Sequence, residues 1–261
     1  MISAGVAAFL VALVAAGCSI DTRTVIVGSA AGRGDAGQGD VAAETVQLPV
    51  CKGTPLKAAL ITDLSDAVPG TDSKGQPQII FGLDPAGLGG GTFTYAAPFL
   101  NAPMLSLEPK GDGQALRVLA DPGVPVDGGD AWFGFGFGLF YIEGGCLDAT
   151  GYAGVQFTIE GSLGTCQLRF GVSISEDDRG EDNPRGGSCA LGAECYSPLS
   201  GPLLPGADGI VIVPFAQISG GNPTKTVDAT AITGVNWQLV APLTGDPCVA
   251  TFTVDDVSFV R

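Results

Sequence analysis

Apolar residues of this chain come in short alternating runs, separated by Gly, Pro, Asp and Asn. A two-residue period is typical of β-strands with one buried face, and no stretch carries the 3.6-residue period of an amphipathic helix. The segments that show the period are Ala58–Thr62, Gln78–Phe81, Ala115–Ala120, Trp132–Tyr141, Gly154–Glu160, Cys166–Ser175, Gly209–Pro214, Ile232–Val240 and Val249–Val260. This density of short strands predicts one all-β domain, an antiparallel β-sandwich or barrel.

The segment "WFGFGFGLFY" (Trp132–Tyr141) has two different faces. Its aromatic residues and Leu139 alternate with three glycines, so the ring side is expected in the core. Glycine inside a strand often marks the close approach of another backbone or of a ligand. The glycine side, flanked by Trp132, is therefore either a tightly packed surface or a floor for a flat sugar ring.

Three other predicted strands, Gly154–Glu160, Cys166–Ser175 and Ile232–Val240, alternate apolar residues with amides, hydroxyls and one arginine. Such groups offer fixed donors and acceptors to sugar hydroxyls, whereas a merely solvated sheet face usually carries a mixture of Lys, Glu and Asp. The alternative is an ordinary solvent-exposed sheet face that binds no ligand. The candidate ligand-binding residues are Trp132, Gln156, Gln167, Arg169, Asn236 and Gln238.

The alternation in the last predicted strand changes parity at Asp255 and Asp256. A carboxylate that faces the core without a partner is costly. Either a β-bulge turns one acid outward, or a hard cation binds it together with other oxygens. Asp63 and Asp66, just after the first predicted strand, could contribute if the first and last strands are neighbours.

Charge and composition exclude several functions. The chain has 261 residues, a net charge of −15 and no histidine. The negative charge argues against nucleic-acid binding. The lack of histidine removes Ser-His and Cys-His catalysis and His-ligated zinc. A glycosidase or lyase built on Glu160 with Asp255 or Asp256 is the catalytic alternative that survives, and we predict a protein that is not an enzyme.

The first residues predict export and a lipid anchor. An apolar run, Val6–Ala16, is too short to span a bilayer and ends in small residues before Cys18. "VAAGC" resembles the lipobox of bacterial lipoproteins, which implies acylation of Cys18. We therefore expect a signal peptide over residues 1–17, an acylated flexible tether over 18–50 and a domain over 51–261. The expected location is the bacterial cell envelope, with membrane contact only through the lipid.

Six cysteines remain once Cys18 is set aside, and an even number in an exported chain predicts disulfides. Two turns that lead into strands precede Cys166 and Cys248, and antiparallel hairpins would bring these residues to the same end of the domain. The predicted pairings are Cys166–Cys248, Cys189–Cys195 and, by elimination, Cys51–Cys146.

Several segments together resemble a known family. These are "ALITDLSDA", "DATGYAGVQFTIEG", "VIVPFAQI", "AITGVNWQLV" and "FTVDDVSFV", which lie in that order between Lys57 and Val260. They are similar to the jelly-roll carbohydrate-binding modules with a galactose-binding-like fold. The resemblance implies a jelly-roll β-sandwich that binds glycans on a sheet face or loop rim. It also implies a structural calcium ion held by Asp63 and by Asp255 or Asp256.

Pattern and resemblance together predict a non-catalytic, envelope-anchored lipoprotein that binds a polysaccharide or another glycan. The alternative is a structural or protein-interaction envelope protein that has no sugar ligand, because the same fold serves proteins that bind no sugar.

Overall fold

The computed structural model describes residues 53–56, 58–72, 74–82, 88–123, 132–139, 146–177, 189, 194–204, 206, 208–222, 224–241 and 248–261. The predicted signal peptide, Cys18 and the tether lie outside these residues. Over the described ranges, no helix has the length and apolar character needed to cross a membrane.

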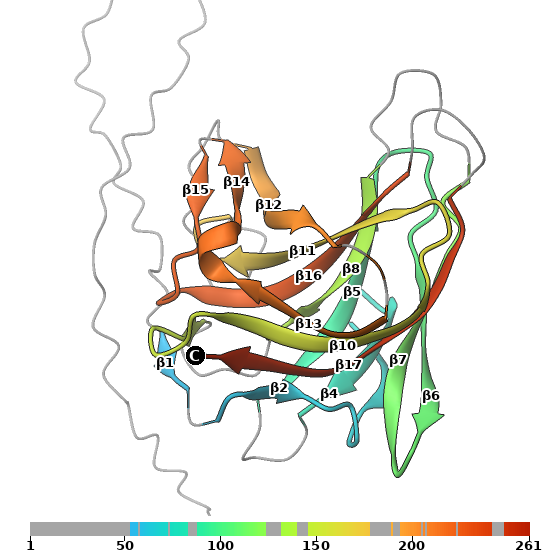
Figure 1. The fold of residues 1–261 in the computed structure, drawn as a ribbon, viewed down its shortest axis with the longest axis horizontal. Coiled ribbons are helices and arrows are strands. Elements are labelled where there is room, and N and C mark those ends of the chain that lie inside the picture. Colours follow the sequence, from blue (N-terminus) through green and yellow to red (C-terminus); the bar gives the residue numbers. More distant parts are fainter. Residues whose placement is uncertain are drawn as a thin grey trace, which may run out of the picture.

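The described strands form two sheets that pack against each other (Figure 1). An 11-stranded sheet, here the larger sheet, contains β1 (Thr54–Pro55), β3 (Val68–Thr71), β4 (Pro77–Phe81), β5 (Gly90–Ala96), β8 (Trp132–Gly138), β9 (Leu147–Asp148), β11 (Gln167–Ile174), β12 (Glu194–Leu203), β14 (Ser219–Asn222), β15 (Lys225–Thr226) and β16 (Ile232–Val240). A 6-stranded sheet, the smaller sheet, contains β2 (Leu60–Thr62), β6 (Met104–Lys110), β7 (Gly113–Ala120), β10 (Gly154–Ser162), β13 (Asp208–Pro214) and β17 (Ala250–Val260).

The order of strands in the larger sheet is β15-β14-β12-β11-β16-β8-β5-β4-β3, and in the smaller sheet it is β13-β10-β17-β7-β6. Among the described residues, only the short pair of β1 and β9 is parallel. A short 3-10 turn, η1 (Phe215–Gln217), follows β13. The prediction of an antiparallel β-sandwich of the jelly-roll type is confirmed.

Each of the nine predicted strands overlaps an observed strand, and β5, β6 and β12 are among the observed strands that were not predicted. In β5 the usual pattern is reversed, because Thr92 is buried on the core side while Phe93 and Tyr95 lie on the outer face.

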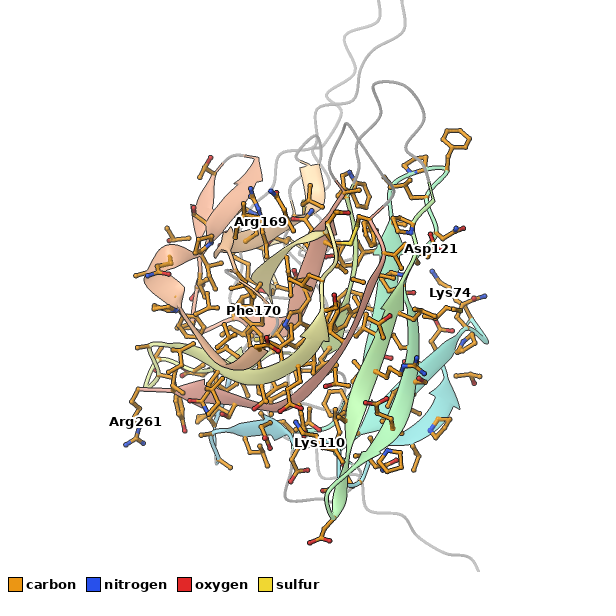
Figure 2. The ribbon with its side chains drawn as sticks, turned by 45° about the vertical axis from the view of Figure 1, so that its right-hand side comes forward. Lys74, Lys110, Asp121, Arg169, Phe170 and Arg261 are labelled. Atoms are coloured by element: carbon orange, nitrogen blue, oxygen red, sulfur yellow. A yellow bond between two sulfur atoms is a disulfide. The ribbon has the colours of Figure 1, made fainter. Side chains whose placement is uncertain are left out.

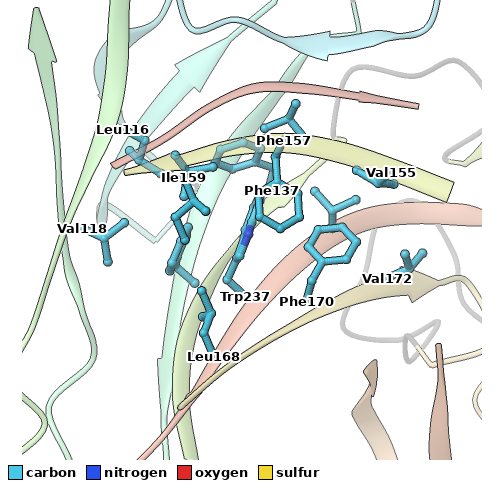
Figure 3. Packing of buried hydrophobic residues seen from close by; sticks show 14 of the residues in the cluster. Leu116, Val118, Phe137, Val155, Phe157, Ile159, Leu168, Phe170, Val172 and Trp237 are labelled. Atoms are coloured by element: carbon cyan, nitrogen blue, oxygen red, sulfur yellow. The ribbon is translucent and has the colours of Figure 1, made fainter. Parts of the chain in front are cut away.

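The core lies between the sheets, and its centre is Trp237 of β16 (Figure 3). Phe135 stacks on the indole at 5.1 Å with an interplanar angle of 8°. Phe137, Phe157 and Phe170 meet it edge-on at centroid distances of 5.1 to 5.3 Å. Since Phe157 belongs to β10 of the smaller sheet, this cluster joins the two layers. The predicted core side of β8 is confirmed.

A β-bulge in β17 explains the change of parity near the C-terminus. Gln156 of β10 pairs with Ser258 and Thr158 pairs with Asp255, so two residues of β17 stand opposite the single residue between them. Asp256 takes up the extra position with φ of 51°, a left-handed conformation that Asp tolerates better than most residues. Its side chain is exposed, and the alternation restarts in phase with the core at Val257.

The first and last predicted strands are neighbours, as expected, because β2 pairs with β17 through Thr62 and Val257 (Figure 1). A disulfide joins Cys166 to Cys248, with Cα atoms 4.9 Å apart, and confirms that predicted pairing. Cys146 and Cys189 are disulfide-bonded as well. Their predicted partners, Cys51 and the side chain of Cys195, lie outside the described residues, so those two pairings stay predictions.

A buried ion pair fixes β15 against the turn that follows β11. The Lys225 ammonium donates to Asp177 Oδ1 at 2.9 Å and to the Glu176 carbonyl at 3.1 Å. Asp177 is only 4% exposed. Burial raises the pKa of this carboxyl above its ordinary value, while the hydrogen bond from Lys225 opposes the rise.

Replacing Lys225 with methionine is expected to lower the free energy of unfolding by about 3 kcal/mol at pH 7, because a buried carboxylate loses its cation. A raised pKa means that folded Asp177 binds a proton at pH values where the unfolded residue does not, so stability falls as pH rises through that window. The loss should therefore be smaller near pH 4. Urea unfolding at both pH values measures it.

Two further variants interpret that result. Lys74→Met, at an exposed lysine that forms no ion pair among the described residues, should change stability by less than about 0.5 kcal/mol. The double variant Lys225→Met/Asp177→Asn should recover part of the loss at pH 7, because the uncompensated charge is gone. Equal losses at the two pH values would contradict the account.

Candidate functional site

The candidate site is the outer face of the larger sheet, which consists of the residues that alternate with core residues along four neighbouring strands. It comprises Phe93 and Tyr95 of β5, Trp132, Gly134, Gly136 and Gly138 of β8, Gly234, Asn236, Gln238 and Val240 of β16, and Gln167, Arg169, Gly171 and Ser173 of β11. Five of the six predicted ligand-binding residues therefore share one face.

The strand register aligns these residues into rows across the sheet. One row runs from Tyr95 through Gly134 and Gln238 to Arg169. At about 4.8 Å between strands, the backbone span from Tyr95 to Arg169 is roughly 15 Å. The next row runs from Phe93 through Gly136 and Asn236 to Gly171, so aromatic residues lie at one end of the face and polar residues at the other.

The glycines of β8 make room for aromatic rings of β5. A Cβ atom on Gly136 would meet the Phe93 ring at 2.4 Å, and one on Gly134 would meet the Tyr95 hydroxyl at 2.6 Å. The Tyr95 hydroxyl donates to the Trp237 carbonyl at 3.4 Å, and burial raises its pKa. Close packing of the Phe93 and Tyr95 rings thus explains the glycines of β8. The rings themselves form the surface over these glycines.

Phe93, Tyr95 and Trp132 form an aromatic row on this face. The Phe93 and Tyr95 rings lie 6.1 Å apart at 29°, and the Tyr95 and Trp132 rings lie 6.1 Å apart at 40°. All three side chains are partly exposed. Of these three residues, only Trp132 was predicted from the sequence. The signal for the other two was the run "TFTY", in which aromatic and β-branched residues alternate as in a strand.

The polar end of the face gathers Gln167, Arg169, Asn236 and Gln238. Gln167 is exposed, and Arg169 and Gln238 are partly exposed. Asn236 is 2% exposed and donates from Nδ2 to Ser173 Oγ at 3.4 Å. Within the described structure its Oδ1 and the Arg169 Nε are buried without a hydrogen-bond partner. Arg169 and its neighbour Phe170 point to opposite faces of β11, and Phe170 enters the core (Figure 2).

Gln156, the sixth predicted ligand-binding residue, is not part of this group. It lies on β10 in the smaller sheet, between Ile212 of β13 and Ser258 of β17. The sequence showed that its strand has a polar face, but it did not show to which sheet that strand belongs.

The three carboxylates predicted to hold calcium have other partners. Asp63 Oδ1 accepts hydrogen bonds from the Ser65 hydroxyl at 2.6 Å and from its backbone N–H at 3.0 Å, which lowers the pKa of Asp63. Asp255 Oδ2 lies 3.5 Å from Lys110 Nζ, and burial raises the pKa of Asp255. Asp256 is exposed.

Over the described residues, no three His, Cys, Asp or Glu side chains are close enough to hold a metal ion. A structural calcium stays a prediction.

The chain was compared with known protein families, curated proteins and solved structures. No protein-family model matches the chain, and no curated protein matches it. Among solved structures, the chain is similar to the family 11 carbohydrate-binding module of the cellulosomal cellulase Lic26A-Cel5E of Clostridium thermocellum. The TM-score is 0.47 and the sequence identity 11%, over 78% of this chain and 95% of that chain.

Proposed function

We propose that this domain binds carbohydrate on the outer face of the larger sheet. The observation that carries the proposal is the placement of aromatic rings, amides and a guanidinium together on one face of four paired strands. Rings stack on the apolar faces of sugars, and the amides and Arg169 supply fixed partners for hydroxyl groups. For such a shallow polar surface we expect dissociation constants of about 1 μM to 1 mM.

The proposed function is binding without catalysis. Glu160 and Asp255 are the strand acids that a glycosidase could use, and they lie on the smaller sheet, away from the aromatic row. The Lys110 ammonium lies 3.5 Å from a carboxylate oxygen of each. Both acids thus already share one cation as an ion-pair partner, on the sheet that does not carry the aromatic row.

The lipid anchor and the envelope location belong to the same proposal. They rest on the apolar run before Cys18 and on the tether that follows it. Replacing Cys18 with alanine should release the protein from the membrane fraction of the producing bacterium. Retention of the variant in that fraction would contradict the anchor.

Binding is tested with the purified chain against immobilised plant and bacterial polysaccharides, followed by titration of the best ligand. Trp132→Ala is expected to weaken binding about tenfold, because one stacking ring is lost, and Gln238→Ala should weaken it by about threefold to tenfold. Gln156→Ala is the matched control for Gln238→Ala, since it removes the same amide from the other sheet. It should leave binding unchanged.

Loss of binding in Gln156→Ala, with Gln238→Ala unaffected, would move the site to the smaller sheet. If the folded protein binds no polysaccharide, the proposal fails.

A second candidate function is a protein contact. Ile210 and Ile212 of β13 are 69% and 57% exposed on the outer face of the smaller sheet, beside Thr158 and Gln156. Two large apolar side chains on a terminal strand favour an interaction surface. Failure of glycan binding together with altered association in Ile210→Ser/Ile212→Ser would favour this function.

A further inference from the structure

The outer face of the larger sheet differs in charge from the rest of this acidic protein. The chain carries 27 acidic and 12 basic residues. Yet the strands β5, β8, β16 and β11 contain no Asp or Glu, and their single charged residue is Arg169. The outer face of the smaller sheet carries both signs, with Glu108, Lys110, Arg117 and Glu160 among its residues.

Arg169 also differs from the other arginines that the structure describes. Arg117 lies 3.8 Å from a Glu108 carboxylate oxygen, and the Arg261 guanidinium lies over the Tyr152 ring at 5.6 Å. For Arg169 no ion pair exists among the described residues, and its buried Nε has no hydrogen-bond partner. A buried donor without a partner costs free energy. A guanidinium also matches a carboxylate in a two-bond geometry.

The neighbours of Arg169 suit a sugar that bears a carboxylate. Gln238 lies directly opposite on β16, and Gln167 lies two residues away on the same face of β11. Their amides donate to and accept from hydroxyl groups. Asn236, one row further, has a buried Oδ1 without a partner within the described structure, which would accept from a ligand hydroxyl.

We propose that the ligand is an acidic polysaccharide and that Arg169 pairs with the carboxylate of a uronic acid residue. This inference rests on the proposed function, because it names the class of glycan bound at the same face. General charge attraction does not produce such binding, since a protein of net charge −15 repels a polyanion at long range. Binding of a polyuronate therefore requires a local contact, and Arg169 supplies it.

The test compares polygalacturonate with the same polymer after chemical reduction of its carboxyl groups to alcohols. The purified full chain is titrated with both at near-physiological salt, where long-range repulsion is largely screened. Wild type is expected to bind the acidic polymer at least about tenfold more tightly than the reduced polymer. Arg169→Gln should abolish this preference, and Arg169→Lys should retain part of it because the charge remains without the fork geometry.

Arg117→Gln is the matched control, because it removes an exposed arginine from the other sheet, and it should leave the preference intact. Unchanged melting temperatures show that the variants fold. Equal binding of both polymers by wild type, or a preference that survives Arg169→Gln, would overturn the inference while leaving carbohydrate binding in place. Equal competition by dextran sulfate would also overturn it, because the face would then recognise any polyanion. Failure of acidic and neutral polymers alike would instead remove the proposed function.

Discussion

Replacing both Cys166 and Cys248 with alanine is expected to lower the free energy of unfolding by about 4 kcal/mol. The disulfide closes a loop between residues 82 apart in sequence, and a chain-entropy model gives about this value for a loop of that size. It also joins the start of β11 in the larger sheet to the residues that lead into β17 in the smaller sheet. Both cysteines are buried, so their replacement would also loosen the packing at that end.

Urea unfolding of the double variant measures the change, and the dependence on urea should steepen because the unfolded chain becomes less compact. The double variant is needed because a single replacement leaves a free thiol that can exchange with the other disulfides. Thr165→Ala/Val249→Ala is the matched control: it alters the exposed neighbours of the same two cysteines and should cost less than about 1 kcal/mol. A loss in the cysteine variant no larger than in this control would contradict the expectation.

The same disulfide illustrates what a sequence can predict. Turn residues before Cys166 and Cys248 placed both cysteines at strand starts, and antiparallel geometry then brought them to one end. Alternation predicted the core side of β8, β10, β11 and β16, because burial of one face imposes a strict two-residue period. These features depend on local pattern, and the structure confirms them.

The bulge at Asp256 required more than local pattern. The parity change showed that something interrupts the strand, but a bulge and a cation site look alike in sequence. The strand register shows that a β-bulge accounts for the parity change. Asp256 occupies the extra position opposite β10, and its side chain lies outside the core.

The aromatic row could not be predicted for a related reason. The three glycines of β8 were consistent with two arrangements: a flat surface that binds a ligand, or close packing against a neighbouring strand. Which arrangement occurs depends on the strand that lies beside β8. The sequence of a single strand does not determine its pairing with a distant strand. Phe93 and Tyr95 fill the space over the glycines, so the missing side chains of one strand are complemented by the rings of the next. Similarly, only the topology separates Gln156 from the other five candidates.

Trp237→Ala is expected to cost about 4 kcal/mol of unfolding free energy, the range for a large aromatic side chain removed from a core. The indole is fully buried and contacts rings from β8, β10 and β11, so its loss opens a cavity between the two sheets. Trp237→Phe should cost only about 1 kcal/mol. A ring remains, and the indole Nε1, which has no hydrogen-bond partner among the described residues, is removed with the rest of the indole.

Trp132→Ala is the matched control, since it removes the other tryptophan from the surface and should cost about 1 kcal/mol or less. Equal losses in Trp237→Ala and Trp237→Phe, measured by urea unfolding, would contradict a packing role. Binding measurements further distinguish the roles of Trp237 and Trp132. The residues on either side of Trp237, Asn236 and Gln238, lie on the outer face, so a collapsed core in Trp237→Ala should also displace them. Trp237→Phe should retain binding, whereas Trp132→Ala should bind about tenfold more weakly and remain stable, because Trp237 supports the face from within and Trp132 lies on the face that we propose binds the sugar.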